Sequence, residues 1–262
     1  MIVFLARKGL KGARRIVIKL GTNIVINQDG RFNSKLITSL LKEISLLRDS
    51  GKLFILVSSG AIGLGNNCLN WKKTRDTLLN QCSASVGQSL LMHEYGLCSK
   101  STGMAMAQVL LTREDLKSSK RKERIKNLIE KLTALKILAI INENDSVSTE
   151  EITFGDNDLL SAYIAQLFNA DLLILLSNVD GVYKDPSTKE IIPLIRVIDS
   201  RIKACITGST SSLGRGGMLS KILAAEIASP AKTVVAKGNE KNVLARIFKG
   251  ENIGTLFHLE KT

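Results

Sequence analysis

IINENDSVSTEEITFGDND, at residues 140–158, is the most informative segment of this sequence. It begins within an apolar run, residues 137–141, which is typical of a buried strand in a parallel sheet. Two clusters of Asn and Asp follow, joined by one loop that contains Gly155. An Asx-rich loop that caps the next helix would use the same residue types. Two clusters at the carboxyl end of a strand, where open α/β folds bind ligands, favour a site for a small polar substrate.

Outward from this stretch, short apolar runs alternate with helical stripes. The predicted strands are residues 16–20, 53–57, 104–111, 137–141, 172–176 and 233–236. The predicted helices are residues 34–48, 83–95, 122–135, 159–168 and 218–227. This alternation predicts an α/β fold with a mostly parallel central sheet and helices on both faces. The 262 residues fit one such domain, which we expect at residues 15–262, after an N-terminal extension at residues 1–14.

The chain is strongly basic, with a formal net charge of +13, which is compatible with nucleic-acid binding. Aromatic residues make up only 4% of the chain, and no common nucleic-acid-binding motif occurs. The densest basic run, residues 117–126, reads as the solvated face of a helix, with Glu123 and Glu130 interleaved. A positive field also serves an enzyme with anionic substrates, so we expect no nucleic-acid partner.

Membrane, secretory and metal-site signals are weak in this sequence. No apolar run approaches the roughly 20 residues that span a bilayer. The N-terminus is apolar and then basic, the reverse of a secretory signal. The four cysteines, Cys68, Cys82, Cys98 and Cys205, form no CxxC pair, which favours reduced thiols and argues against zinc. We therefore expect a cytoplasmic protein without a protein-bound metal or a membrane partner.

Phosphate chemistry is indicated without a Walker motif, because the chain has neither GxxxxGK[ST] nor GxGxxG. Three glycine-containing turns, residues 19–22, 58–61 and 214–218, could present backbone N–H groups to phosphates at helix starts. Each turn alone is an ordinary feature. Lys19 is more informative, because a lysine within the apolar segment IVIKLG is costly to bury unless an anion accompanies it.

Several further segments carry a resemblance to a known family. They are RIVIKLGTNIVI (15–26), VSSGAIGLG (57–65), SVGQSLLM (85–92), QVLLTREDL (108–116), INENDSV (141–147), FGDNDLLSA (154–162), LLILLSNVDGVYKDP (172–186), LGRGGMLSKILAA (213–225) and GTLF (254–257). In this order they resemble the amino acid kinase family, in its glutamate 5-kinase branch, across nearly the whole chain. The resemblance implies a three-layer αβα sandwich. It also implies ATP-dependent phosphorylation of the side-chain carboxylate of L-glutamate to glutamyl 5-phosphate, the first step of proline biosynthesis.

The resemblance also implies roles for individual residues. Lys19 and Lys221 match the lysines that neutralise the transferring phosphoryl group, and Asp158 matches the aspartate that organises them. The implied glutamate-binding residues are Ser59, Gly60, Asn142, Asp145 and Asn157. The implied nucleotide-binding residues are Lys19, Ser177, Asn178, Gly214, Arg215, Gly216, Gly217, Met218 and Lys221. Mg²⁺ is expected mainly on the ATP phosphates.

Three positions depart from the family pattern. Thr153 stands where many members have a lysine, Asn178 replaces an aspartate, and Arg215 replaces a threonine. None removes a catalytic role, but each changes a charge or a polar group near a ligand. His93 and His258 are expected to be surface or structural residues, since a carboxylate nucleophile needs no general base.

The resemblance further implies L-proline as a feedback inhibitor, a homo-oligomer, and glutamate-5-semialdehyde dehydrogenase as a potential partner. Many glutamate 5-kinases continue into an RNA-binding-type PUA domain, which we do not expect here because the chain ends just after GTLF. Two alternatives stay open. One is another amino acid kinase, acting on acetylglutamate, aspartate or UMP. The other is a non-catalytic ligand sensor, against which the joint presence of Lys19, Asp158 and Lys221 argues.

Overall fold

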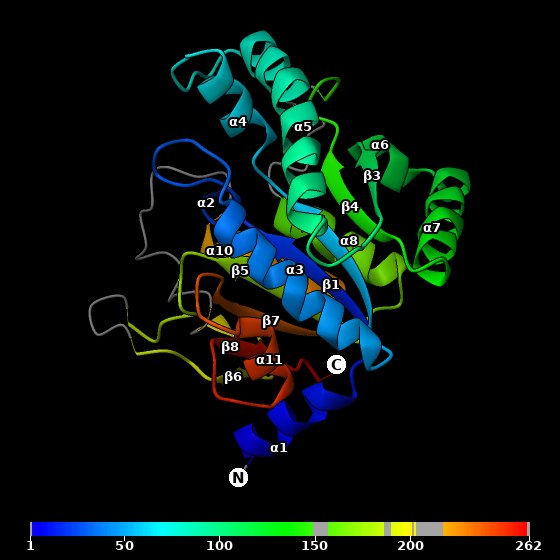
Figure 1. The fold of residues 1–262 in the computed structure, drawn as a ribbon. Coiled ribbons are helices and arrows are strands. Elements are labelled where there is room, and N and C mark those ends of the chain that lie inside the picture. The colour runs from blue at the N-terminus through cyan, green and yellow to red at the C-terminus, as the bar shows by residue number, and fades with distance from the viewer. Residues whose placement is uncertain (1, 149–156, 186–189, 201, 203–216, 261–262) are drawn as a thin grey trace.

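A central eight-stranded sheet organises the chain (Figure 1). The computed structural model describes residues 2–148, 157–185, 190–200, 202 and 217–260. Strand order is β3-β4-β2-β1-β5-β7-β8-β6, and β7–β8 is the one antiparallel pair among the described neighbours. The strands are β1 (Arg15–Leu20), β2 (Leu53–Ser58), β3 (Met106–Leu111), β4 (Leu138–Glu143), β5 (Leu172–Ser177), β6 (Leu194–Ile195), β7 (Lys232–Lys237) and β8 (Thr255–Phe257).

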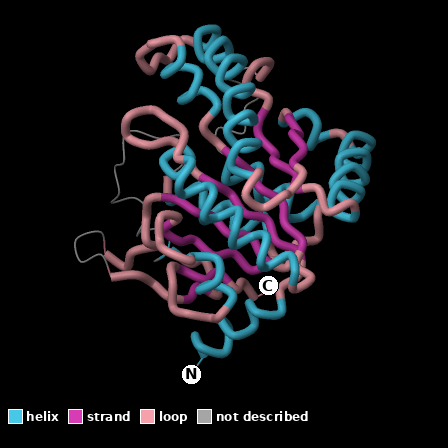
Figure 2. Tube along the Cα trace, viewed as in Figure 1, coloured by secondary structure: helices cyan, strands magenta, loops and turns pink. Residues whose placement is uncertain are grey.

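Helices cover both faces of this sheet, which confirms the predicted three-layer αβα sandwich (Figure 2). The helices are α1 (Ile2–Lys8), α2 (Thr22–Val25), α3 (Ser34–Asp49), α4 (Ala61–Cys68), α5 (Thr77–Ser99), α6 (Arg113–Lys117), α7 (Ser119–Ala134), α8 (Asn157–Leu167), α10 (Met218–Ala228) and α11 (Val243–Phe248), with a 3₁₀ turn, η1, at Gly9–Gly12. All six predicted strands are confirmed to within two residues at each end. No helix in the described part of the chain is long and apolar enough to cross a membrane.

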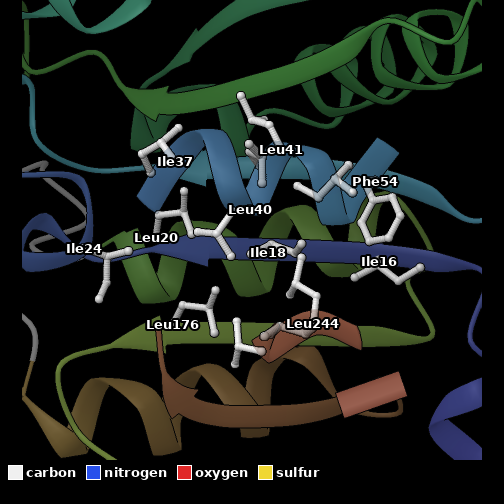
Figure 3. Close-up of a cluster of buried hydrophobic side chains, with 14 of the residues drawn as sticks. Ile16, Ile18, Leu20, Ile24, Ile37, Leu40, Leu41, Phe54, Leu176 and Leu244 are labelled. Carbon is white, nitrogen blue, oxygen red and sulfur yellow. The ribbon is translucent and has the colours of Figure 1, made fainter. Parts of the chain in front are cut away.

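The sheet divides the apolar core into two layers. The central strand β1 contributes to both, because successive side chains of a strand point to opposite faces. Ile16, Ile18 and Leu20 face α3 and α11, where Leu40 packs over them (Figure 3). Val17 faces the other side, in the cluster that α7, α8 and α10 complete. Lys19, two positions after Val17, therefore lies on the side of the sheet that α8 and α10 cover.

Residues ahead of β1 fold against the far end of the sheet. The Arg7 side chain is 1% exposed and its guanidinium donates hydrogen bonds to backbone carbonyls of Pro193, Glu251, Ile253 and Gly254, at 2.6–3.0 Å. Burial lowers the pKa of Arg7 to about 10, so the group remains charged at neutral pH. This arginine binds the first helix to the segment that leads into β8.

The hairpin of α4 and α5 packs at backbone contact. A Cβ on Gly65 would lie 1.8 Å from the carbonyl oxygen of Ser83, and a Cβ on Gly87 would lie 1.8 Å from that of Ala61. Such distances are far inside van der Waals contact, so the two helices can approach this closely only with glycine at both positions.

We predict that Gly87→Ala destabilises the fold by about 3 kcal/mol, because the added methyl group overpacks a backbone contact. Gly96 lies on the same helix, and a Cβ there meets nothing within 4 Å. Gly96→Ala is the matched control and should stabilise by up to about 1 kcal/mol through helix propensity. Urea unfolding of both variants measures the difference. Equal stability of the two variants would contradict the packing.

Candidate active site

Lys19 lies near the carboxyl end of β1, on the face that α8 and α10 cover. Its side chain is 6% exposed, and its Nζ lies 2.6 Å from Oδ1 of Asp158. The sequence predicted that a lysine at this position would need an anionic partner, and Asp158 supplies it. The alternation along β1 explains the direction, since Lys19 follows Val17 on the same face.

Asp158 stands in the first turn of α8 and is completely buried. Its second oxygen, Oδ2, accepts hydrogen bonds from Lys221 Nζ at 2.9 Å and from Ser220 Oγ at 3.0 Å. Ser220 and Lys221 both lie in the first two turns of α10, and the Lys221 side chain is 6% exposed. One carboxylate therefore joins the central strand to two helices and gathers two ammonium groups.

Electrostatics keep this carboxylate ionised. Burial alone would raise the pKa of Asp158, but the charges and hydrogen bonds of Lys19 and Lys221 outweigh burial and hold the pKa well below its usual range. The helix position acts in the same direction, because a negative charge in the first turn of α8 meets the positive end of the helix dipole. The starts of α8 and α10 thus form an electropositive edge.

A second, neutral cluster adjoins this ion triad (Lys19, Asp158 and Lys221). Asn157, the residue before Asp158, donates through Nδ2 to Ser59 Oγ and Asn142 Oδ1, both at 2.9 Å, and to the Ser58 carbonyl at 3.1 Å. Its own Oδ1 is buried and has no hydrogen-bond partner among the described residues. Because a buried polar atom normally has a partner, Asn157 Oδ1 is a candidate contact for a ligand N–H group.

Gly60 follows Ser59 and ends the turn after β2. Its φ of 113° lies in the left-handed region, which side chains other than glycine rarely adopt. A Cβ there would also lie 3.1 Å from the side chain of Val25. The glycine lets the chain turn sharply into α4, so that Ser59 reaches Asn157.

Asp145 is half-buried in the turn after β4, two residues beyond Glu143. Its neighbour Asn144 anchors this turn, donating its backbone N–H to the Leu111 carbonyl at 2.8 Å. The structure thus places Asp145 at the same sheet edge as Asn142, which is 2% exposed at the end of β4.

The predicted nucleotide side is described in part. Ser177 is buried at the end of β5 and Asn178 is exposed beside it. Gly217 is the N-cap of α10, and Met218 begins that helix. Gly214, Arg215, Gly216 and Thr153 lie outside the described residues. The described arrangement joins the β5 edge to the helix that carries Lys221.

Two contributors were not assigned roles from the sequence. Ser220 bonds Asp158, and its position directly before Lys221, three residues after the N-cap glycine, was a signal that could have indicated it. Gln88, within SVGQSLLM, accepts a hydrogen bond from Asn142 Nδ2 at 2.9 Å. The burial of Gln88 could not be predicted from the sequence, because a glutamine on a helix is ordinarily exposed.

Comparison with known proteins agrees with this geometry. An αβα sandwich whose strand ends gather lysines and helix starts is suited to binding and transferring phosphoryl groups. The pattern of the amino acid kinase family matches residues 14–234, and the chain belongs to this family.

Within that family, the curated relatives compared are glutamate 5-kinases. The chain is 41% identical to the glutamate 5-kinase of Clostridium acetobutylicum, an alignment that covers 95% of this chain and 96% of the relative. It is 42% identical to that of Listeria monocytogenes, with 97% and 96% covered. It is 41% identical to that of Nitrosospira multiformis, with 94% of this chain and 68% of the relative covered.

Solved structures show the same fold at low sequence identity. The UMP kinase of Bacillus anthracis superimposes with a TM-score of 0.62 at 18% identity, covering 94% of this chain and 96% of its own. The isopentenyl phosphate kinase of T. acidophilum gives 0.65 at 13% identity, covering 93% and 99%. These two likenesses concern the fold alone.

We predict that Asp158→Asn lowers the free energy of unfolding by about 3–5 kcal/mol at pH 7, because it leaves two buried ammonium groups without their carboxylate. The folded-state pKa of Asp158 is lowered, so its stabilisation is complete above the unfolded pKa of about 3.9 and is lost as pH falls through the folded value. The difference in free energy of unfolding between wild type and variant should therefore decrease below about pH 4.

Urea unfolding between pH 7 and pH 3 measures this gap. Asp29→Asn is the control, because the Asp29 carboxylate is exposed and pairs with the Arg31 side chain at 3.8 Å. Its Oδ1 also accepts from the Arg31 backbone N–H at 3.1 Å, a hydrogen bond that asparagine can keep. A change near zero is expected for the control. A gap below about 1 kcal/mol for Asp158→Asn at pH 7 would contradict the assigned electrostatics.

Proposed function

We propose that this protein is an ATP-dependent kinase that phosphorylates the side-chain carboxylate of L-glutamate. The observation that carries the proposal is the convergence of Lys19 and Lys221 on Asp158 at the carboxyl edge of the sheet. Membership of the amino acid kinase family and about 41% identity to glutamate 5-kinases support glutamate as the acceptor.

The reaction transfers the γ-phosphoryl group of ATP. The bond between phosphorus and the β,γ-bridging oxygen breaks, and a new bond forms to an oxygen of the glutamate side chain, giving ADP and an acyl phosphate. The nucleophile is already a carboxylate, so no proton is removed. The main obstacle is the approach of one anion to another, which fixed positive charge and alignment overcome.

The residues of the site fit these needs. Lys19 and Lys221 neutralise charge on the phosphoryl oxygens, while Asp158 holds both ammonium groups in place before the ligands arrive. The backbone at Gly217 opens α10, whose positive end also favours phosphate. Ser177 borders the nucleotide. Asn178 and the segment Gly214, Arg215 and Gly216, with Met218, complete the proposed nucleotide side.

The neutral cluster and Asp145 hold glutamate. Asp145 and the unpartnered Asn157 Oδ1 are acceptors, and both suit the substrate ammonium group. Ser59 and the turn at Gly60 suit the α-carboxylate. The amide nitrogen of Asn157 already bonds within the protein, so its oxygen is the atom proposed to contact glutamate.

Mg²⁺ enters the proposal with the nucleotide, held mainly by ATP phosphates. Within the part of the chain that the structure describes, no group of three or more His, Cys, Asp or Glu residues is placed to hold a metal ion. Asp158, the buried carboxylate nearest the phosphates in this scheme, is bonded to two lysines.

The same proposal includes inhibition by L-proline, a partner enzyme, a homo-oligomer and a cytoplasmic location. L-proline carries the α-carboxylate and a cationic amine of glutamate but no side-chain carboxylate, so it would occupy the site without accepting phosphate. The product is an acyl phosphate, which water hydrolyses readily, so close association with the glutamate-5-semialdehyde dehydrogenase that consumes it would be useful. A homo-oligomer in the cytoplasm completes the proposal.

ATP turnover measured with glutamate, acetylglutamate, aspartate and UMP tests the function. We expect ADP release with glutamate and at most background with the others. Preference for another acceptor would move the protein to a different branch of the family. Absence of turnover with all four would favour a ligand sensor.

Lys19→Ala and Lys221→Ala should each lower kcat by about 10²–10³-fold, because each removes a preorganised charge from the transition state. Lys120→Ala, an exposed lysine on α7, is the control and should leave kcat unchanged. Steady-state assays at saturating glutamate and ATP, with thermal melts of each variant, measure the effect. Near-normal turnover in both site variants would refute the assigned roles.

Asp145→Ala should raise KM for glutamate by about tenfold or more, the loss expected when a charged hydrogen bond to the ammonium is removed. The inhibition constant of L-proline should rise in proportion, while KM for ATP stays within about twofold. Inhibition assays at subsaturating glutamate measure both. A variant that loses ATP affinity but keeps glutamate affinity would show that the two subsites are reversed.

A further inference from the structure

Four side-chain amides form a continuous chain of hydrogen bonds from the edge strand β3 to the start of α8. Gln88 Nε2 donates to Gln108 Oε1 at 3.0 Å, and Gln88 Oε1 accepts from Asn142 Nδ2 at 2.9 Å. Asn142 Oδ1 accepts from Asn157 Nδ2 at 2.9 Å. The chain therefore ends at the residue proposed to contact the substrate ammonium.

The direction of this amide chain is fixed by backbone groups. The backbone N–H of Glu143 donates to Asn142 Oδ1 at 2.9 Å, so that atom must be the oxygen. Asn142 therefore directs Nδ2 toward Gln88, and the Gln88 atom that faces it must be the acceptor, Oε1. At the other end the Ser58 carbonyl accepts from Asn157 Nδ2, which turns Asn157 Oδ1 to the remaining side.

Helix α5 presents a polar face to the substrate side of the site. Gln81, Ser85 and Gln88 recur at the spacing that places residues on one helical face. Gln81 Nε2 donates to the Ser148 carbonyl and Ser85 Oγ to Ser146 Oγ, both at 3.0 Å. The helix thus holds both the loop after β4 and the amide of Asn142.

Gln88 is the buried link through which this amide chain passes from α5 to β4. It is 8% exposed and bonded at both ends of its amide. Gln108 is exposed, and its amide can turn to match whatever Gln88 presents. A buried amide cannot turn without leaving a neighbour unsatisfied, so Gln88 Oε1 supports the orientation that the backbone groups fix. A donor in its place would oppose that orientation at Asn142 and, through Asn142, at Asn157.

We propose that Gln88 is a positioning residue for substrate binding, acting through Asn142 to aim Asn157 Oδ1 at the substrate ammonium group. Gln88 touches no reacting atom in this scheme. Its effect lies in the affinity for glutamate and not in phosphoryl transfer. The inference rests on the proposed function, because it assigns Asn157 to the glutamate site.

Gln88→Glu and Gln88→Lys test the proposal as a matched pair. Both place a charged side chain at the same buried position, but Glu can accept from Asn142 Nδ2 and lysine can only donate. With lysine at position 88, Asn142 has two arrangements. Either its Nδ2 faces the ammonium group, donor against donor, or its Oδ1 turns away from Glu143 and Asn157. Gln88→Met, which neither donates nor accepts strongly, lies between them.

From lowest to highest, the expected order of KM for glutamate is wild type, Gln88→Glu, Gln88→Met and Gln88→Lys. We expect Gln88→Glu within about threefold of wild type, Gln88→Met about tenfold higher and Gln88→Lys about a hundredfold higher. KM for ATP, and kcat at saturating glutamate, should stay within about twofold in all three. Ser89→Ala, an exposed neighbour on α5, is the control and should change none of these values.

Steady-state kinetics and thermal melts of each variant supply the measurements. A purely structural Gln88 would lower the melting temperature in all variants and raise KM without regard to hydrogen-bond polarity. Equal KM values in Gln88→Glu and Gln88→Lys, or in Gln88→Glu and Gln88→Met if the lysine variant does not fold, overturn the inference while the kinase assignment stands. A wild-type protein without glutamate-dependent turnover overturns both.

Discussion

The buried contact of Asp158 with Lys19 and Lys221 is the interaction on which the rest of the site depends. Removing two ammonium groups and a carboxylate from water is costly, and close pairing with good hydrogen bonds is what offsets the cost. The carboxylate is placed by the start of α8, one lysine by β1 and the other by α10. The relative position of three elements is therefore tied to one ionised group, and the site is assembled before any ligand binds.

The two halves of the site are held by different kinds of force. The phosphoryl side relies on ionic charge, which acts over several ångströms and tolerates small displacements. The substrate side relies on neutral amides, whose bonds depend on direction and on which atom donates. Asn157 and Asp158 are consecutive, so the boundary between these halves falls within one turn of α8. Charge suits the many oxygens of a phosphate, and directed amides suit one particular amino acid.

Much of this organisation could be predicted from the sequence, for physical reasons. Short apolar runs such as residues 172–176, alternating with helical stripes, favour strands covered by helices on both faces, so the strands and the layers could be predicted. Lys19 was informative because a lysine among buried residues requires an anion. Gln88 could not be found in this way, since a glutamine on a helix is ordinarily exposed and its role depends on the neighbours that the fold brings to it. The burial of Arg7 was missed for the same reason, because its partners are backbone carbonyls distant in sequence.

Those partners have a consequence for the order in which the protein can fold during synthesis. Arg7 bonds to carbonyls that lie 186 to 247 residues further along the chain. The ribosome therefore makes Arg7 before β1, and the carbonyl of Gly254 only after β7. Until then the guanidinium of Arg7 lacks three of its four carbonyl partners, those of Glu251, Ile253 and Gly254. Helix α1 therefore completes its contacts only after residues 251–254 have been made, so a segment translated before β1 reaches its native position later than the strands it precedes.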